Sequence, residues 1–159
     1  MFQKLTRIFL LQIFFTQVIF AQKSTTRFVD KFLPLAKKLS SEFGIPVSII
    51  LGVSIHESAS GTSRNCKDLN NYFGVKGKNH LKKRKTNYKQ YEKSEDSFRD
   101  FCGIISRKKF YSKLKDTNDY KRWLTEMNNA SYAGAKESWI NAVSKIIRYY
   151  KLSDYDEEK

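Results

Sequence analysis

Cysteine, histidine and proline are scarce in this chain, with two of each among 159 residues. Two thiols cannot form the dense framework of a disulfide-stapled domain, and so few histidines and cysteines supply a zinc site poorly. The sequence contains no glycine-rich phosphate loop and no nucleophile elbow. Seven glycines with two prolines exclude a collagen-like or linker-dominated chain. We therefore expect no metal site and no cofactor.

Acidic residues are also few, 16 against 30 Lys and Arg, which gives a net charge of +14. Apolar residues make up 40% and aromatic residues 14% of the chain, enough for the packed core of one ordinary domain. A disordered chain would contain fewer aromatic residues. The charge predicts attraction to a polyanion, which could be nucleic acid, an acidic membrane surface or an anionic wall polymer.

The N-terminal segment 1–21 has the layout of a secretory signal peptide. Lys4 and Arg7 precede an interrupted apolar run over 8–20, and Ala21 is the expected cleavage position. The run is short for a spanning helix, which needs about 20 apolar residues, and the alternative is an uncleaved anchor. Cleavage would remove two cations and no acid, lowering the charge from +14 to +12. We expect export to the periplasm or outside the cell, with no stable membrane span after cleavage and no nucleic-acid partner.

Hydrophobic spacing predicts a mainly α fold, with a core domain over 28–155 between a polar tail at 22–27 and an acidic, frayed tail at 156–159. Pro46 suits a first helical turn, and the acids after Ser94 favour a helix start. The expected elements are helices over 28–43, 47–57, about 94–105, from 119 and about 135–150, a loop over 58–80 and a β-hairpin within 81–93.

Glu57 is an acid at the end of an otherwise apolar helix. A buried carboxylate needs a reason, and both desolvation and the negative end of a helix favour its protonated form. A protonated carboxylic acid is what a glycosidase uses to protonate a leaving-group oxygen. The structural alternative is a Glu that caps the following loop. The residues alone leave these two interpretations open.

Four ordered segments resemble glycoside hydrolase family 73, which includes autolysins and the hydrolase domain of a flagellar assembly protein. They are HESASGTS (56–63), LNNYFGVKG (69–77), YKQYEKSEDSFRDF (88–101) and NNASYAG (128–134). The resemblance covers essentially residues 28–155. It implies a lysozyme-like helical bundle with a small β-hairpin lobe beside a substrate groove. It also implies hydrolysis of the glycosidic bond after N-acetylglucosamine in peptidoglycan glycan strands.

The resemblance assigns roles to individual residues. Glu57 matches the catalytic Glu as general acid, and Tyr132 matches a Tyr that lines the catalytic groove. Positions in or beside the matched segments are expected to contact substrate: Ser63, Asn71, Phe73, Gly74 and Lys76. By residue type alone, Asn71 and Gly74 could be turn residues, Phe73 could be core and Tyr132 an ordinary packing aromatic.

The chain departs from the family pattern at three places. Segment 57–63 lacks the usual Trp, and segment 131–136 lacks the usual Thr and Asp-Pro. Hairpin residues 77–87 contain no acid where many members carry a second carboxylate. Asp68 and Glu92 are weak candidates for that role. Substrate assistance, in which the 2-acetamido oxygen attacks the anomeric carbon, would need only one protein acid. The alternatives are a catalytically weak or inactive peptidoglycan-binding module, and a muramidase or lytic transglycosylase.

Eight cations fall within residues 76–93, opposed only by Glu92. A run of this kind is usually a solvated face, but in a lobe beside a glycan groove it would attract an anionic wall surface. The eight are Lys76, Lys78, Lys82, Lys83, Arg84, Lys85, Lys89 and Lys93. Cys66 and Cys102 are the two cysteines, and in an exported protein they would form one disulfide or remain two inert thiols. The sequence leaves the oligomeric state open.

Overall fold

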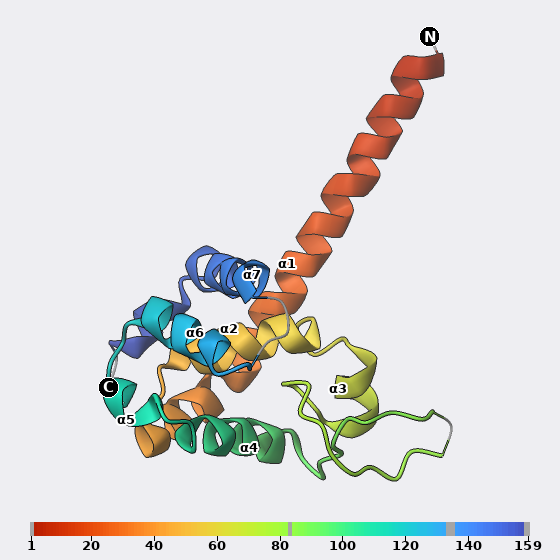
Figure 1. Ribbon diagram of the computed structural model, residues 1–159. Coiled ribbons are helices and arrows are strands. Elements are labelled where there is room, and N and C mark those ends of the chain that lie inside the picture. The colour runs from red at the N-terminus through yellow and green to blue at the C-terminus, as the bar shows by residue number, and fades with distance from the viewer. Residues whose placement is uncertain (1, 83, 133–135, 158–159) are drawn as a thin grey trace.

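The structure is a computed structural model that describes the backbone of residues 2–82, 84–132 and 136–157, and side chains from residue 22 onward except Lys136. Several sequence predictions lie outside the described residues: the side chains of segment 1–21, Lys83 in the basic run, residues 133–135 of the fourth motif, and tail residues 158–159. The fold is mainly helical, as predicted, and Figure 1 shows the helices gathered around α2 with a loop-rich lobe on one side.

The central element is α2 (Val47–Ser58), which is apolar on all sides and buried along nearly its whole length. A helix without a polar face must lie inside the protein. It packs against α1 (Phe2–Phe43), α6 (Tyr120–Asn129), α7 (Lys136–Tyr149) and a 3-10 helix, η1 (Leu152–Asp156). Gly52 permits the close approach to α7, because a Cβ atom there would lie 2.7 Å from Ile147. The predicted helix over 47–57 is confirmed.

Three other predicted helices are present at nearly the expected bounds, whereas the helix predicted over 28–43 is the C-terminal part of α1, which begins at Phe2. The apolar faces of α4 (Ser94–Ser106), α6 and α7 enter the core, and the Asp119 carboxylate accepts from the Arg122 backbone N–H at the start of α6. Two short helices, α3 (Arg64–Leu69) and α5 (Tyr111–Leu114), were not predicted. Helix α3 lies within the expected loop and begins where the Ser63 hydroxyl accepts from the Cys66 N–H.

The predicted β-hairpin is not found as strands among the described residues. Segments 75–78 and 87–90 run antiparallel and are joined by three backbone hydrogen bonds, but in the described structure they form only an isolated bridge, between Lys76 and Tyr88. Side chains add to this pairing, because the Asn79 amide donates to the carbonyls of Thr86 and Tyr88, both at 2.9 Å. Like charges on facing segments also oppose a regular ladder. We call residues 75–93 the basic lobe.

Both predicted tails are wrong in part, because each end packs onto the core. Segment 22–27 continues α1, and Thr25 is buried with its hydroxyl 2.7 Å from that of Ser60. Asp156 is buried and accepts from the backbone N–H and hydroxyl of Ser48, at 2.9 and 2.6 Å. The C-terminal η1 thereby caps the start of α2, where unpaired N–H groups and a positive helix end favour a carboxylate.

Cys66 and Cys102 are free and buried, so the structure contains two thiols and not the disulfide that was one alternative. Burial raises the pKa of both groups, which makes them poor nucleophiles. Within the helices that the structure describes, none is long and apolar enough to cross a membrane.

Candidate active site

Glu57 lies in the last turn of α2, half-buried, where the chain leaves the core. The turn that follows has an unusual backbone: Ala59, Ser60 and Gly61 have φ values of 49°, 54° and 79°. The Ser58 hydroxyl braces this turn by donating to the Ser54 carbonyl at 2.6 Å and accepting from the Gly61 N–H at 2.8 Å. Left-handed backbone in non-glycine residues is a strain that the surrounding structure must hold. The fold therefore ends α2 sharply beside the carboxylate.

One oxygen of the Glu57 carboxylate is fixed by a tryptophan. The Trp139 indole N–H donates to Glu57 Oε1 at 2.9 Å, and Trp139 is itself buried on α7. No other hydrogen bond to this carboxylate comes from the residues that the structure describes. The two oxygens are thus in different environments, since Oε1 is anchored and Oε2 has no protein donor from that set.

The turn at Gly74 faces the second oxygen. Gly74 has a φ of +66°, and a Cβ atom built there would lie 3.7 Å from Glu57 Oε2 and 3.8 Å from the Tyr88 ring. The turn is held by Asn71, whose side-chain amide donates to the carbonyls of Val75 and Lys89, both at 2.8 Å. A Cβ atom at position 74 would therefore be in van der Waals contact with the second carboxylate oxygen.

Tyr132 completes the wall of the site. Its ring lies 5.6 Å from that of Trp139, centroid to centroid, and its hydroxyl is 3.4 Å from the Phe73 carbonyl. Burial, and next the negative charge of Glu57, raise the pKa of Tyr132 well above its usual range. The phenol is consequently neutral near neutral pH, where it can donate a hydrogen bond.

The structure brings some predicted site residues together and places others elsewhere. Glu57, Tyr132, Gly74 and the Phe73 carbonyl meet, whereas the Phe73 ring is buried and stacks on Phe101 at 4.2 Å. Asn71 is buried and its amide is engaged with backbone, so its described role is to hold the turn. The Ser63 hydroxyl caps α3, and Lys76 is exposed on the basic lobe.

Neither candidate for a second carboxylate contacts Glu57 in the described structure. Asp68 accepts from Arg84 Nη2 at 3.3 Å, and the Glu92 side chain is exposed beyond the turn that Asn70 holds. Across residues 2–82, 84–132 and 136–157, no group of three or more His, Cys, Asp and Glu is arranged to hold a metal ion. The chemistry available at this site is that of one carboxylic acid with two neutral donors, an indole N–H and a phenol.

Sequence reasoning missed Trp139 as a site residue. Its spacing with Val143 and Ile147 predicts an inward-facing core residue, and it is indeed 5% exposed. The signal that could have identified it is its indole N–H, because a buried donor needs an acceptor. The apolar face of α7 offers no hydrogen-bond acceptor, so the acceptor for the Trp139 N–H comes from another element, α2.

Comparison with known proteins identifies the class. Residues 33–152 match the glucosaminidase family, described as mannosyl-glycoprotein endo-beta-N-acetylglucosaminidase. The match spans most of the chain and includes Glu57 and Tyr132. The chain belongs to this family and is a glycoside hydrolase, which confirms the resemblance that the four sequence motifs indicate.

Solved structures share the fold at low sequence identity. The catalytic domain of the autolysin Auto from Listeria monocytogenes superposes with a TM-score of 0.68 at 19% identity, over 84% of this chain and 88% of that one. The glycoside hydrolase domain of FlgJ from Salmonella typhimurium gives 0.63 at 19% identity, over 82% and 90%. These similarities establish a common fold.

A relative in sequence is an N-acetylmuramoyl-L-alanine amidase domain-containing protein of Staphylococcus aureus, 24% identical over 86% of this chain. The match covers 26% of that protein, so this chain corresponds to about a quarter of its relative's length.

Proposed function

We propose that the protein hydrolyses peptidoglycan at the glycosidic bond after N-acetylglucosamine, with Glu57 as the general acid. The observation that carries the proposal is the Glu57 carboxylate, anchored through Oε1 by Trp139 with Oε2 facing the open side of Gly74. The family membership supplies the glucosaminidase chemistry. Peptidoglycan as substrate is supported by structural neighbours such as a peptidoglycan hydrolase from Sphingomonas, with a TM-score of 0.65 over 81% of this chain.

The mechanism uses one protein carboxyl group. Protonated Oε2 of Glu57 gives its proton to the glycosidic oxygen as the bond to the anomeric carbon breaks. The 2-acetamido oxygen of the same sugar attacks the anomeric carbon, and water then opens the cyclic intermediate and returns a proton to Glu57. Substrate assistance is favoured because segment 77–87 contains no acid and Asp68 accepts from Arg84 Nη2 at 3.3 Å. The neutral Tyr132 hydroxyl is suited to hold the acetamido group.

The surroundings of the site suit an anionic polymer that carries glycan strands. Lys76, Lys78 and Lys85 are exposed on the basic lobe and line a wide depression of about 870 Å³. Two other cations of the lobe are neutralised, Arg84 by Asp68 and Lys89 by Asp100. Lys76, Lys78 and Lys85 would raise the local concentration of wall polymer near the site. Action on a cell wall implies export, which the layout of residues 1–21 also predicts.

Glu57→Gln tests the proposal directly, because the amide retains the side chain's shape but cannot donate the proton. We expect activity on purified peptidoglycan to fall by a factor of about 10²–10⁴, the usual contribution of a general acid. Glu92→Gln is the matched control and should keep full activity. Circular dichroism checks that both variants fold. Full activity in folded Glu57→Gln would remove Glu57 from the mechanism.

A further inference from the structure

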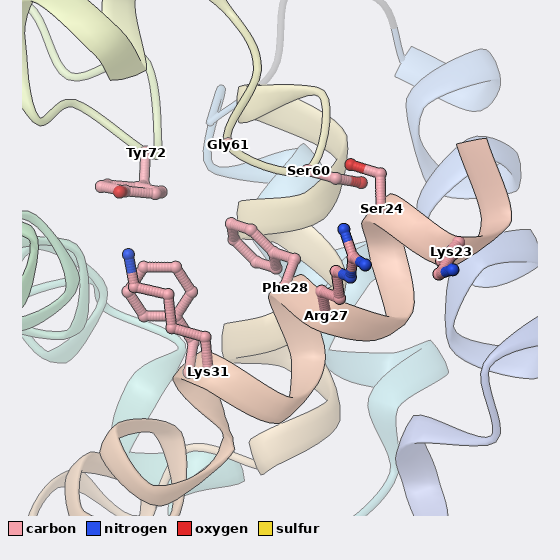
Figure 2. A pocket seen from close by; sticks show the side chains of 9 residues that line it. Lys23, Ser24, Arg27, Phe28, Lys31, Ser60, Gly61 and Tyr72 are labelled. Atoms are coloured by element: carbon pink, nitrogen blue, oxygen red, sulfur yellow. The ribbon is translucent and has the colours of Figure 1, made fainter. Parts of the chain in front are cut away.

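A separate pocket borders the turn that follows Glu57. It has a volume of about 390 Å³ and is formed by the exposed side of α1, the turn at Ser60 and Gly61, and the Tyr72 ring (Figure 2). Thr25 and Ser60 close one side through their hydroxyls, 2.7 Å apart. Nothing in the proposed mechanism uses this pocket.

Three cations of α1 line the pocket. Lys23, Arg27 and Lys31 recur every four residues, so they share one face of the helix, and all three are exposed. In Figure 2 the Lys31 ammonium points toward the Tyr72 ring and the Arg27 guanidinium toward the turn at Ser60. No carboxylate lines the pocket, and within the described part of the chain these cations form no ion pair. Like charges at this spacing repel, and a bound anion would offset that repulsion.

The floor of the pocket is aromatic. Phe28 and Phe32 have ring centroids 4.7 Å apart, and the Tyr72 ring lies 5.0 Å from Phe32. Gly61 rests on Phe28, since a Cβ atom there would approach the ring to 3.2 Å. The pocket has room for on the order of ten water molecules at liquid volume, far more than a simple inorganic anion fills. A ligand with an apolar body and one anionic end matches both the floor and the rim.

The pocket is close to the catalytic carboxylate. Ser60 is three residues after Glu57, which limits their Cα separation to about 11 Å even for extended chain. Tyr72 is two residues before Gly74, so the two turns that border Glu57 also border this pocket. One departure from the family pattern lies at this pocket, because Ser60 occupies the position where the usual motif has Trp. The turn therefore presents a small side chain to the pocket.

We propose that this pocket binds the carboxylate-bearing peptide stem attached to the glycan, with Arg27 and Lys31 holding the carboxylate and the aromatic floor holding its aliphatic part. The inference rests on the proposed function for the identity of the polymer. It adds a site for the peptide beside the site for the sugar. Glycan strands that carry stems would then be preferred over bare strands.

N-acetylmuramyl dipeptide is the probe, because it carries one stem carboxylate and lacks the bond that the proposed function cleaves. Binding to the wild-type protein is measured by calorimetry, and amide chemical shifts locate it. We expect shifts at Phe28, Gly61 and Tyr72, and at least tenfold weaker binding of the uncharged amide form of the probe. Binding that is absent at millimolar probe, or equal for both forms, would overturn the proposal.

Variants distinguish binding in the pocket from nonspecific attraction to the positive charge of the protein. Arg27→Gln with Lys31→Gln should weaken binding at least tenfold, and Ser24→Trp should do so by filling the pocket without changing charge. Lys121→Gln with Lys145→Gln removes the same charge from exposed positions elsewhere and should stay within twofold. Equal losses in both double variants, or full displacement by an equal concentration of inorganic phosphate, would contradict a stem site. Hydrolysis without probe binding refutes only this inference, and probe binding without hydrolysis refutes only the proposed function.

Discussion

The two oxygens of the Glu57 carboxylate have different partners, and the proposed reaction depends on that difference. Oε1 accepts the Trp139 indole N–H, whereas Oε2 faces Gly74. In the proposed mechanism, an anchored carboxyl group loses less conformational freedom when it transfers its proton, which lowers the barrier. We therefore propose that Trp139 is a positioning residue that acts through Glu57.

Trp139→Phe tests this role by removing the N–H and keeping an aromatic ring. A hydrogen bond to a charged group is worth about 1.5–3 kcal/mol, so we expect kcat to fall roughly 10- to 100-fold with KM little changed. Steady-state kinetics on a soluble glycan provide the measurement. Trp123→Phe is the matched control, because it also removes an indole N–H bond, to the Thr117 carbonyl at 3.1 Å, and that bond does not involve Glu57. Equal kcat losses in both variants would mean that only stability has changed.

At the scale of elements, the site depends on how two peripheral segments are fixed to the core. The basic lobe is tied to α4 by Asp100, which accepts from Lys89 Nζ at 2.7 Å and from the Tyr91 hydroxyl at 2.8 Å. The start of α2 is tied to η1 by Asp156. Both carboxylates are remote from Glu57 in sequence, yet each holds one of the elements that position it.

Asp100 makes the free energy of unfolding depend on pH. Burial raises the pKa of Asp100, but the hydrogen bonds from Lys89 and Tyr91 and the charges of Lys89 and Arg107 outweigh burial and lower it. Because folding lowers this pKa, the ionised Asp100 stabilises the folded protein at pH values above its pKa in the unfolded chain, about 3.9. That stabilisation is lost as the pH falls through the pKa of Asp100 in the folded protein. Asp100→Asn should therefore lower the free energy of unfolding by about 1 kcal/mol at pH 7. In urea titrations the difference from wild type should shrink toward pH 3, and a constant difference would contradict this account.

Asp156→Ala should destabilise the whole domain by about 1–3 kcal/mol, because it leaves the buried Ser48 hydroxyl and N–H without their acceptor. Chemical denaturation is the measurement. Asp154→Ala, at an exposed position two residues earlier, should change stability by less than about 0.5 kcal/mol. A small effect at both positions would show that η1 does not hold the start of α2.

For the molecule as a whole, local patterns predicted most of the helices and a carboxylate at the end of α2, but not the contacts between distant segments. The apolar run of α2 and its terminal Glu57 are readable from sequence because burial dictates residue type over several turns. Trp139 was placed in the core, and its second role depends on a partner 82 residues away. Residues 22–27 and 156 were predicted to lie outside the domain because they are mostly polar. The buried hydrogen bonds of Thr25 with Ser60 and of Asp156 with Ser48 join distant parts of the chain and leave no local pattern.

The structure shows where groups of the cations behind the net charge of +14 lie. Some cations of the basic lobe are paired with acids, others are exposed around a depression, and a separate set lines the pocket on α1. Composition could indicate only that some polyanion is bound. The grouping of exposed cations in two separate hollows is what favours a glycan polymer with anionic substituents.

The most direct test of the central claim is mass spectrometry of the fragments released from purified peptidoglycan, which reports activity and bond choice together. The account predicts fragments with N-acetylglucosamine at their reducing ends from the wild-type protein, and none from Glu57→Gln. Fragments ending in reducing or anhydro-N-acetylmuramic acid would instead indicate a muramidase or lytic transglycosylase. Sedimentation with peptidoglycan without any released fragment would indicate a binding module, and either result would contradict the glucosaminidase mechanism.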